Sequence, residues 1–249
     1  MKANKTIAEI TEDYPVSSRL DLPQNMDQGG RFWVRRIVAV FMKSAFKVRI
    51  EGLDQLPSTG PAIIIANHSS YFDIPLIHVF VKPWIYFVAK LELFKPGFPR
   101  RFLAWWGAIP LNREHVSLQA ARDILGLLRQ GRILCIFPEG TRLRTDIDRR
   151  LYPPKTGVYH FARKTGASII PMGISADFRF RHQVKLTIGP SFTLKDLTRE
   201  DARFQNEETA SIEMMRRVYA LAGVNEYPLT TADYEAERER NQARKGRNP

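Results

Sequence analysis

Short apolar segments alternate with segments of helical periodicity from residue 46 onward, and this alternation limits the fold more than any other feature of the chain. The strand-like segments are rich in β-branched and aromatic residues and lie at 46–52, 62–67, 84–90, 107–113, 133–138, 168–174 and 184–189. Helical patterns lie between several of them, at 74–81, 117–131 and 157–166. This order predicts a single α/β domain whose sheet is largely parallel or mixed and is flanked by helices.

The segments outside this pattern define the remaining organisation. We divide the chain into a loosely ordered N-terminal arm (1–30), an amphipathic helix (31–46), the α/β domain (47–225) and a charged C-terminal tail (226–249). Two more helices are expected at 206–222 and 232–244. The second is charged almost all round, so we expect it to be a solvated tail.

The helix predicted at 31–46 has two readings. Its apolar residues recur at helical spacing and are Trp33, Val34, Ile37, Val38, Phe41, Met42 and Ala45. The stripe can pack on the protein core, or it can lie in a membrane interface with the neighbouring arginines among lipid headgroups. The segment "FKPGFPRRFLAWWGAI" (94–109) is a second candidate for membrane contact, for a core-packed segment or for a hydrophobic groove.

Charge and composition restrict the partners. The net charge is +12, and residues 31–200 hold 27 basic and 12 acidic side chains, which favours anionic partners. The single cysteine, Cys135, excludes an internal disulfide and a multi-cysteine metal site, and we expect it to be a buried strand residue. The sequence shows neither a signal peptide nor the roughly 18 uninterrupted apolar residues of a membrane span. We therefore expect a protein that neither spans the bilayer nor is exported.

The stretch "NHSSYFDIP" (67–75) places a histidine five residues before an aspartate, directly after the buried segment "PAIIIA". If the intervening residues form a turn, Asp73 can accept a hydrogen bond from one imidazole nitrogen of His68 and leave the other as a base. Alternatively, Asp73 is only the N-cap of the helix that follows. These residues alone leave both readings open, and the two roles are compatible if each carboxylate oxygen serves one of them.

The stretch "FPEGTR" (137–142) follows another buried strand and fits a phosphate group. Gly140 and Thr141 offer backbone N–H groups and a hydroxyl, and Arg142 offers a two-pronged donor. Glu139 would repel a phosphate, so we expect it to accept a hydrogen bond from a substrate hydroxyl or to hold a neighbouring arginine. The alternative is an ordinary strand-end turn whose arginine pairs with an acid.

Two weaker motifs lie near these. Arg113 ends the short apolar strand of "WGAIPLNRE" (106–114), and a lone arginine there is most often solvated. In "YPPKTG" (152–157), Lys155 and Gly157 stand just before a helix, whose N-terminus favours an anion.

Taken together and in this order, the four motifs resemble those of the glycerophospholipid acyltransferase family, which includes the 1-acyl-glycerol-3-phosphate acyltransferases. The family's Asn-His-x4-Asp, Gly-x-Ile…Arg and Phe-Pro-Glu-Gly-Thr-Arg blocks and its later proline-containing block appear here at Asn67 to Asp73, Gly107 to Arg113, Phe137 to Arg142, and "IIPMGI" with Pro171. The resemblance covers roughly residues 30 to 200.

The resemblance implies a reaction in phospholipid biosynthesis. An acyl group would move from acyl-CoA or acyl carrier protein (acyl-ACP) to the free hydroxyl of 1-acyl-glycerol-3-phosphate (lysophosphatidic acid), with His68 as general base and Asp73 orienting it. Arg113, Arg142 and the loop at 139–142 would bind the acceptor, with Lys155 and Gly157 as helpers. The sequence does not identify the oxyanion donors.

Several rival readings differ in acceptor or in class. A member of the same family could act on another lysophospholipid or on an acylated amino-acid lipid. A nucleic-acid-binding protein is disfavoured because no recognised module with base-stacking aromatics is visible, and a phosphohydrolase lacks an evident nucleophile or metal site. We therefore expect no metal, no cofactor and no nucleic-acid partner. Because both substrates implied by the resemblance carry fatty chains, we also expect a membrane surface as a partner and a peripheral protein on its cytoplasmic face.

Overall fold

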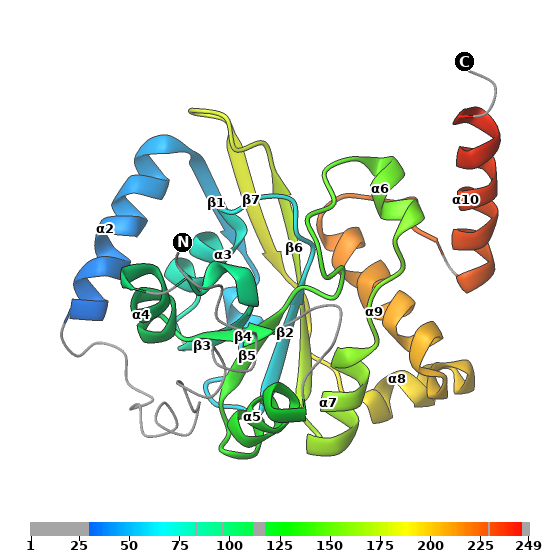
Figure 1. The fold of residues 1–249 in the computed structure, drawn as a ribbon, viewed down its shortest axis with the longest axis horizontal. Coiled ribbons are helices and arrows are strands. Elements are labelled where there is room, and N and C mark those ends of the chain that lie inside the picture. The colour runs from blue at the N-terminus through cyan, green and yellow to red at the C-terminus, as the bar shows by residue number, and fades with distance from the viewer. Residues whose placement is uncertain (1–29, 83, 96, 112–117, 229, 246–249) are drawn as a thin grey trace, which may run out of the picture.

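The computed structural model describes residues 30–82, 84–95, 97–111, 118–228 and 230–245, and a seven-stranded sheet forms its centre (Figure 1). The strand order is β1-β7-β6-β2-β5-β3-β4. The strands are β1 (Lys47–Glu51), β2 (Ala62–Ala66), β3 (Ile85–Lys90), β4 (Ala108–Leu111), β5 (Ile133–Ile136), β6 (Ser168–Ala176) and β7 (Gln183–Ile188). Every pairing is parallel except that of β6 with β7, so the predicted α/β domain with a mixed sheet is confirmed.

Helices cover both faces of this sheet. They are α2 (Gly30–Ala45), α3 (Asp73–Phe80), α4 (Phe98–Trp105), α5 (Leu118–Arg129), α6 (Asp146–Leu151), α7 (Gly157–Thr165), α8 (Leu194–Glu200), α9 (Glu207–Leu221) and α10 (Thr231–Lys245). The sequence patterns did not predict α4, α6 and α8, because helices of six to eight residues show barely two turns of periodicity. A better signal for α6 and α8 is the capping box that begins each of them, at Thr145 with Asp148 and at Thr193 with Asp196.

Alternate residues of the sheet face two separate hydrophobic cores. Every residue of β2 is buried; Ile63 and Ile65 belong to one core, and Ala62, Ile64 and Ala66 belong to the other. Helices α5, α7 and α9 cover the first core, and α2 and α3 cover the second from the opposite side (Figure 1). A strand buried on both faces reads as a continuous apolar run, as "AIIIA" does.

Helix α2 divides its apolar residues between the core and the surface. Val34, Val38 and Met42 pack into the second core. Four other apolar residues lie more than half exposed, at Trp33, Ile37, Val40 and Phe41. The Arg35 guanidinium donates to the carbonyl oxygens of Val79 and Val81 at 3.1 and 2.8 Å, next to the end of α3, and so fixes α2 to the domain.

Helix α10 corrects the expectation of a fully solvated tail. Its Tyr234 is only 1% exposed and belongs to the first core. In addition, Arg238 donates to the Leu151 carbonyl oxygen at 3.0 Å, which joins α10 to α6. The charged pattern concealed this contact because a single aromatic residue is enough to anchor a short helix.

Candidate active site

Asn67 fixes the point at which the chain leaves the sheet. Its side-chain amide donates to the Ile174 carbonyl oxygen at 2.9 Å and accepts from the Ile174 N–H at 2.7 Å. This two-bond contact continues the pairing of β2 with β6 by one residue, now through a side chain. His68 therefore follows at the carboxyl end of β2, where ligand-binding loops gather in parallel sheets.

The chain then turns so that His68 and Asp73 meet. The Nδ1 atom of His68 lies 2.8 Å from Oδ2 of Asp73, and the two side chains are 8% and 0% exposed. The same oxygen accepts the backbone N–H groups of Ser69 and Ser70 at 2.7 and 2.8 Å. Because a carboxylate only accepts, Nδ1 is the donor and the imidazole carries its lone pair on Nε2.

The predicted capping role of Asp73 is wrong. Phe72 is the N-cap of α3, and no side chain caps that helix. Instead, one oxygen of Asp73 gathers three donors that precede it in the chain, while Oδ1 has no hydrogen-bond partner among the described residues. Asp73 thus shapes the turn before the helix and orients the histidine with the same atom.

The FPEGTR loop encloses His68 from its other side. The Phe137 ring stacks on the imidazole with centroids 4.2 Å apart and an interplanar angle of 23°. The Leu143 N–H donates to the His68 carbonyl oxygen at 2.8 Å, and the His68 N–H donates to Oε2 of Glu139 at 3.0 Å. Both ends of this loop therefore hold the backbone and ring of the histidine in place.

Glu139 occupies a different position from the one expected of a substrate-binding residue. It is 4% exposed, and its second oxygen accepts the hydroxyl of Tyr219, on α9. Burial raises the pKa of Glu139 to about 8, and the hydrogen bonds from Tyr219 and from the His68 backbone oppose that rise. Since both carboxyl oxygens have partners within the protein, Glu139 serves to hold the backbone N–H of His68 in place.

Gly140, Thr141 and Arg142 form the outer part of the loop. Gly140 has a φ of 68°, and its N–H donates to the Phe137 carbonyl oxygen at 3.0 Å, so this group closes the turn and does not serve as the expected phosphate donor. Thr141 is exposed. The Arg142 guanidinium lies 3.6 Å from the centroid of the Tyr71 ring, and its Nη1 is buried without a hydrogen-bond partner among the described residues.

The structure brings the second of the two weaker motifs, at 152–157, to this loop. The Lys155 N–H donates to the Pro138 carbonyl oxygen at 2.8 Å, and a Cβ added at Gly140 would lie 3.5 Å from the Lys155 side chain. Gly157 is the first residue of α7. Arg113 lies outside the described residues, so its place in the site stays a prediction.

Chemically, the arrangement offers an oriented histidine as a base. Cys135 is buried in β5, as expected, and burial raises the pKa of its thiol to about 12, so it remains protonated. A histidine oriented by a carboxylate, next to an arginine with an unpartnered buried N–H, can deprotonate a hydroxyl on an anionic substrate. The sequence did not predict that Tyr219 contacts Glu139 or that Phe137 stacks on His68, and it indicated no role for Asn67.

Comparison with known proteins shows the family of this chain. A family model described as Acyltransferase matches residues 47–175, so the chain belongs to the acyltransferase family. Curated relatives include the 1-acyl-sn-glycerol-3-phosphate acyltransferases of Borreliella burgdorferi, which is 33% identical over 52% of this chain, and Bacillus subtilis, 30% identical over 50%. The matched segments span 51% and 60% of the length of these two relatives.

A solved structure supports both family and fold. The 1-acyl-sn-glycerophosphate (LPA) acyltransferase PlsC from Thermotoga maritima superimposes with a TM-score of 0.59 at 26% sequence identity. The match covers 84% of this chain and 85% of that one. The resemblance to the glycerophospholipid acyltransferases noted in the sequence is thereby confirmed.

Proposed function

We propose that this protein transfers a fatty acyl group from acyl-CoA or acyl-ACP to the free hydroxyl of 1-acyl-glycerol-3-phosphate, which forms phosphatidic acid. The observation that carries the proposal is the buried hydrogen bond of 2.8 Å between His68 and Asp73, inside the segment that the acyltransferase family model matches. The relatives support this choice of acceptor, because several are 1-acyl-sn-glycerol-3-phosphate acyltransferases.

In the proposed reaction, Nε2 of His68 removes the proton of the acceptor hydroxyl as its oxygen attacks the thioester carbonyl carbon. A C–O bond forms, the C–S bond breaks, and the histidine returns the proton to the leaving thiolate. Asp73 stabilises the imidazolium that exists between these two transfers, through the hydrogen bond to Nδ1. A positioned base of this kind contributes roughly 10²–10⁴-fold to the rate.

Arg142 is the proposed partner of the acceptor phosphate. A buried guanidinium N–H without a partner favours an anion, since leaving such a donor unpaired is costly. The Tyr71 ring beneath the guanidinium limits its motion while leaving the N–H groups in its plane to donate. Lys155, whose side chain lies along Gly140, adds a second positive charge to the same loop, and Arg113 stays a candidate.

The test is an assay of the purified protein with a panel of lysophospholipids and both thioester donors. Phosphatidic acid formed from lysophosphatidic acid in preference to other acceptors supports the proposal. Turnover of a different lysophospholipid or of an acylated amino-acid lipid, with none of lysophosphatidic acid, would replace the acceptor and keep the mechanism. No transfer to any acceptor from either donor would overturn the function.

Replacing Arg142 by alanine is expected to raise the KM for lysophosphatidic acid about 10- to 100-fold, because a hydrogen bond to a charged group contributes about 1.5–3 kcal/mol. The KM for the thioester donor should stay unchanged. Steady-state kinetics with each substrate varied in turn measures both constants. Arg163→Ala, which removes an equal charge from an exposed position on α7, is the control; an unchanged acceptor KM in Arg142→Ala would count against the assignment.

We further propose that the protein works at a membrane surface, as a peripheral protein on the cytoplasmic face. No helix in the described part of the chain is long and apolar enough to cross a bilayer. The exposed apolar residues of α2 follow helical spacing, and neighbouring α4 adds Phe98, which is 77% exposed. Arg31 links the two helices, since its guanidinium lies 5.4 Å from the Trp105 ring centroid of α4. Exposed apolar side chains among arginines fit an anionic lipid interface.

Ile37→Glu is therefore expected to weaken binding to vesicles of anionic lipid roughly 10- to 100-fold, because burying one large aliphatic side chain contributes about 1.5–3 kcal/mol. Co-sedimentation with vesicles measures the change. Ile147→Glu is the matched control: Ile147 is 52% exposed, and it lies on α6, across the sheet from α2 (Figure 1). Equal binding by the two variants would contradict the assignment of this surface to α2.

A further inference from the structure

Tyr219 connects the C-terminal part of the chain to the candidate active site. It is 1% exposed on α9, and its hydroxyl donates to Oε1 of Glu139, whose Oε2 accepts the His68 N–H at 3.0 Å. Burial raises the pKa of Tyr219 above its usual range, so the hydroxyl remains a donor. One carboxylate thus joins α9 directly to the residue that carries the proposed base.

Two further tyrosines fix the ring of Tyr219. The Tyr227 ring lies against it, with the two ring centroids 4.6 Å apart. The Tyr234 ring packs edge to face with Tyr227, and their ring centroids are 6.3 Å apart. All three rings are buried, and the guanidinium of Arg149 lies 5.5 Å from the Tyr219 ring centroid. The segment before α10 and α10 itself therefore contribute rings to a buried group that reaches Glu139 through Tyr219.

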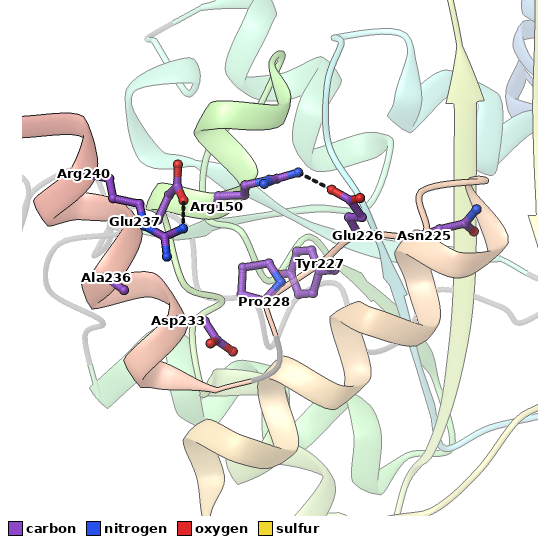
Figure 2. A pocket seen from close by; sticks show the side chains of 9 residues that line it. All are labelled: Arg150, Asn225, Glu226, Tyr227, Pro228, Asp233, Ala236, Glu237 and Arg240. Carbon is purple, nitrogen blue, oxygen red and sulfur yellow. Dashed lines mark hydrogen bonds and ion pairs between the residues drawn. The ribbon is translucent and has the colours of Figure 1, made fainter. Parts of the chain in front are cut away.

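Figure 2 shows the surroundings of Tyr227, the middle ring of these three. Tyr227 and Pro228 border a hollow of about 400 Å³ between α6, the segment before α10, and α10. Ion pairs lie on its rim, from Arg150 to Glu226 at 2.7 Å and from Arg240 to Glu237 at 3.4 Å. Because the hollow separates much of α10 from the domain, the buried Tyr234 is its main apolar anchor here.

We infer that Tyr219 is a positioning residue for acyl transfer: through Glu139 it holds the backbone at His68, and so it keeps the imidazole aligned with Asp73 and with the substrate hydroxyl. The inference rests on the proposed function. The geometry leaves Glu139 only two donors, His68 N–H and Tyr219 O–H, among the hydrogen bonds seen in the described residues. Without the Tyr219 hydroxyl, the buried carboxyl group of Glu139 would keep one oxygen without a partner and would shift toward another donor.

Tyr219→Phe tests the inference, since it removes the hydroxyl and keeps the ring. We expect kcat to fall on the order of 10-fold, because small misplacement of a reacting group lowers the rate without changing binding. The KM values for acceptor and donor should stay within about twofold of those of the wild type. In parallel, hydrogen exchange of the His68 backbone amide should become about 10-fold faster, as its acceptor is less firmly held.

Tyr159→Phe is the matched control. Tyr159 is also a buried tyrosine, and its hydroxyl donates to the Gln205 carbonyl oxygen at 2.6 Å, away from the dyad. It should lose comparable stability but keep the wild-type kcat and the wild-type exchange at His68. Wild-type kcat and exchange in Tyr219→Phe, or equal losses in both variants, would overturn the inference. Inactivity of the wild type on every acceptor would overturn the proposed function instead, and the exchange measurement would still decide whether Tyr219 holds His68.

Discussion

His68→Ala is expected to lower kcat for acyl transfer by about 10²–10⁴-fold, the contribution of a positioned general base. The physical reason is that the imidazole is the group with a free lone pair at the carboxyl end of β2, and Asp73 holds its other nitrogen at 2.8 Å. Binding of the acceptor should change little, because Arg142 and not His68 is the proposed phosphate partner. Single-turnover kinetics at saturating substrates measures the loss directly.

The variant should still fold, since the turn keeps two of its three hydrogen bonds to Asp73, from the N–H groups of Ser69 and Ser70. The lost stack on Phe137 is expected to lower the melting temperature slightly, which circular dichroism can follow. His160→Ala, at an exposed histidine of α7 that pairs with Glu207, controls for loss of a histidine as such. Full transferase activity in a folded His68→Ala protein would end the assignment of the base.

The strands could be predicted from sequence because their signal is local. A strand buried on both faces, such as β2, must be apolar at every position, so the run "AIIIA" marks it without knowledge of its neighbours. The antiparallel direction of β7 also has a local cause, since the connection between Ala176 and Gln183 is too short for a parallel crossover. The pairing of β7 with β1 is not local in this sense, because it brings Gln183 beside Lys47, far away in the chain.

The contacts of the candidate active site also divide into local ones and ones between residues far apart in the chain. His68 and Asp73 could be predicted as a pair because a turn of a few residues is enough to join them. Glu139 and Tyr219 are separated by 80 positions, and a buried tyrosine on an amphipathic helix looks like any other core residue. Only the packing of α9 against the sheet gives its hydroxyl a specific partner.

A wrong prediction at Gly140 has a related cause. Gly140 has a φ of 68°, which suits a glycine, but the residue type did not show which way its N–H points. The turn directs that N–H to the Phe137 carbonyl oxygen, whereas the buried Nη1 of Arg142 has no hydrogen-bond partner among the described residues. A glycine in a loop predicts backbone conformation more safely than it predicts a ligand contact.

Asp73→Asn is expected to lower kcat by about 10²–10⁴-fold with little change in either KM, because a neutral amide cannot stabilise the imidazolium formed during proton transfer. The three donors that converge on Oδ2 require an oxygen there, so the new NH₂ group must take the place of Oδ1. That position is buried, and the oxygen now there has no hydrogen-bond partner in the described part of the chain. An unpaired buried donor costs about 1–3 kcal/mol of folding stability.

Activity and stability must therefore be measured separately, by kinetics well below the melting temperature and by denaturant unfolding. Asp196→Asn is the control, because Asp196 also accepts a backbone N–H, that of Thr193 at 2.9 Å, but does so at the start of α8. We expect this control to lose stability and keep its kcat. If Asp73→Asn behaved in the same way, Asp73 would only shape the turn, and the charge beside His68 would have no part in the transfer.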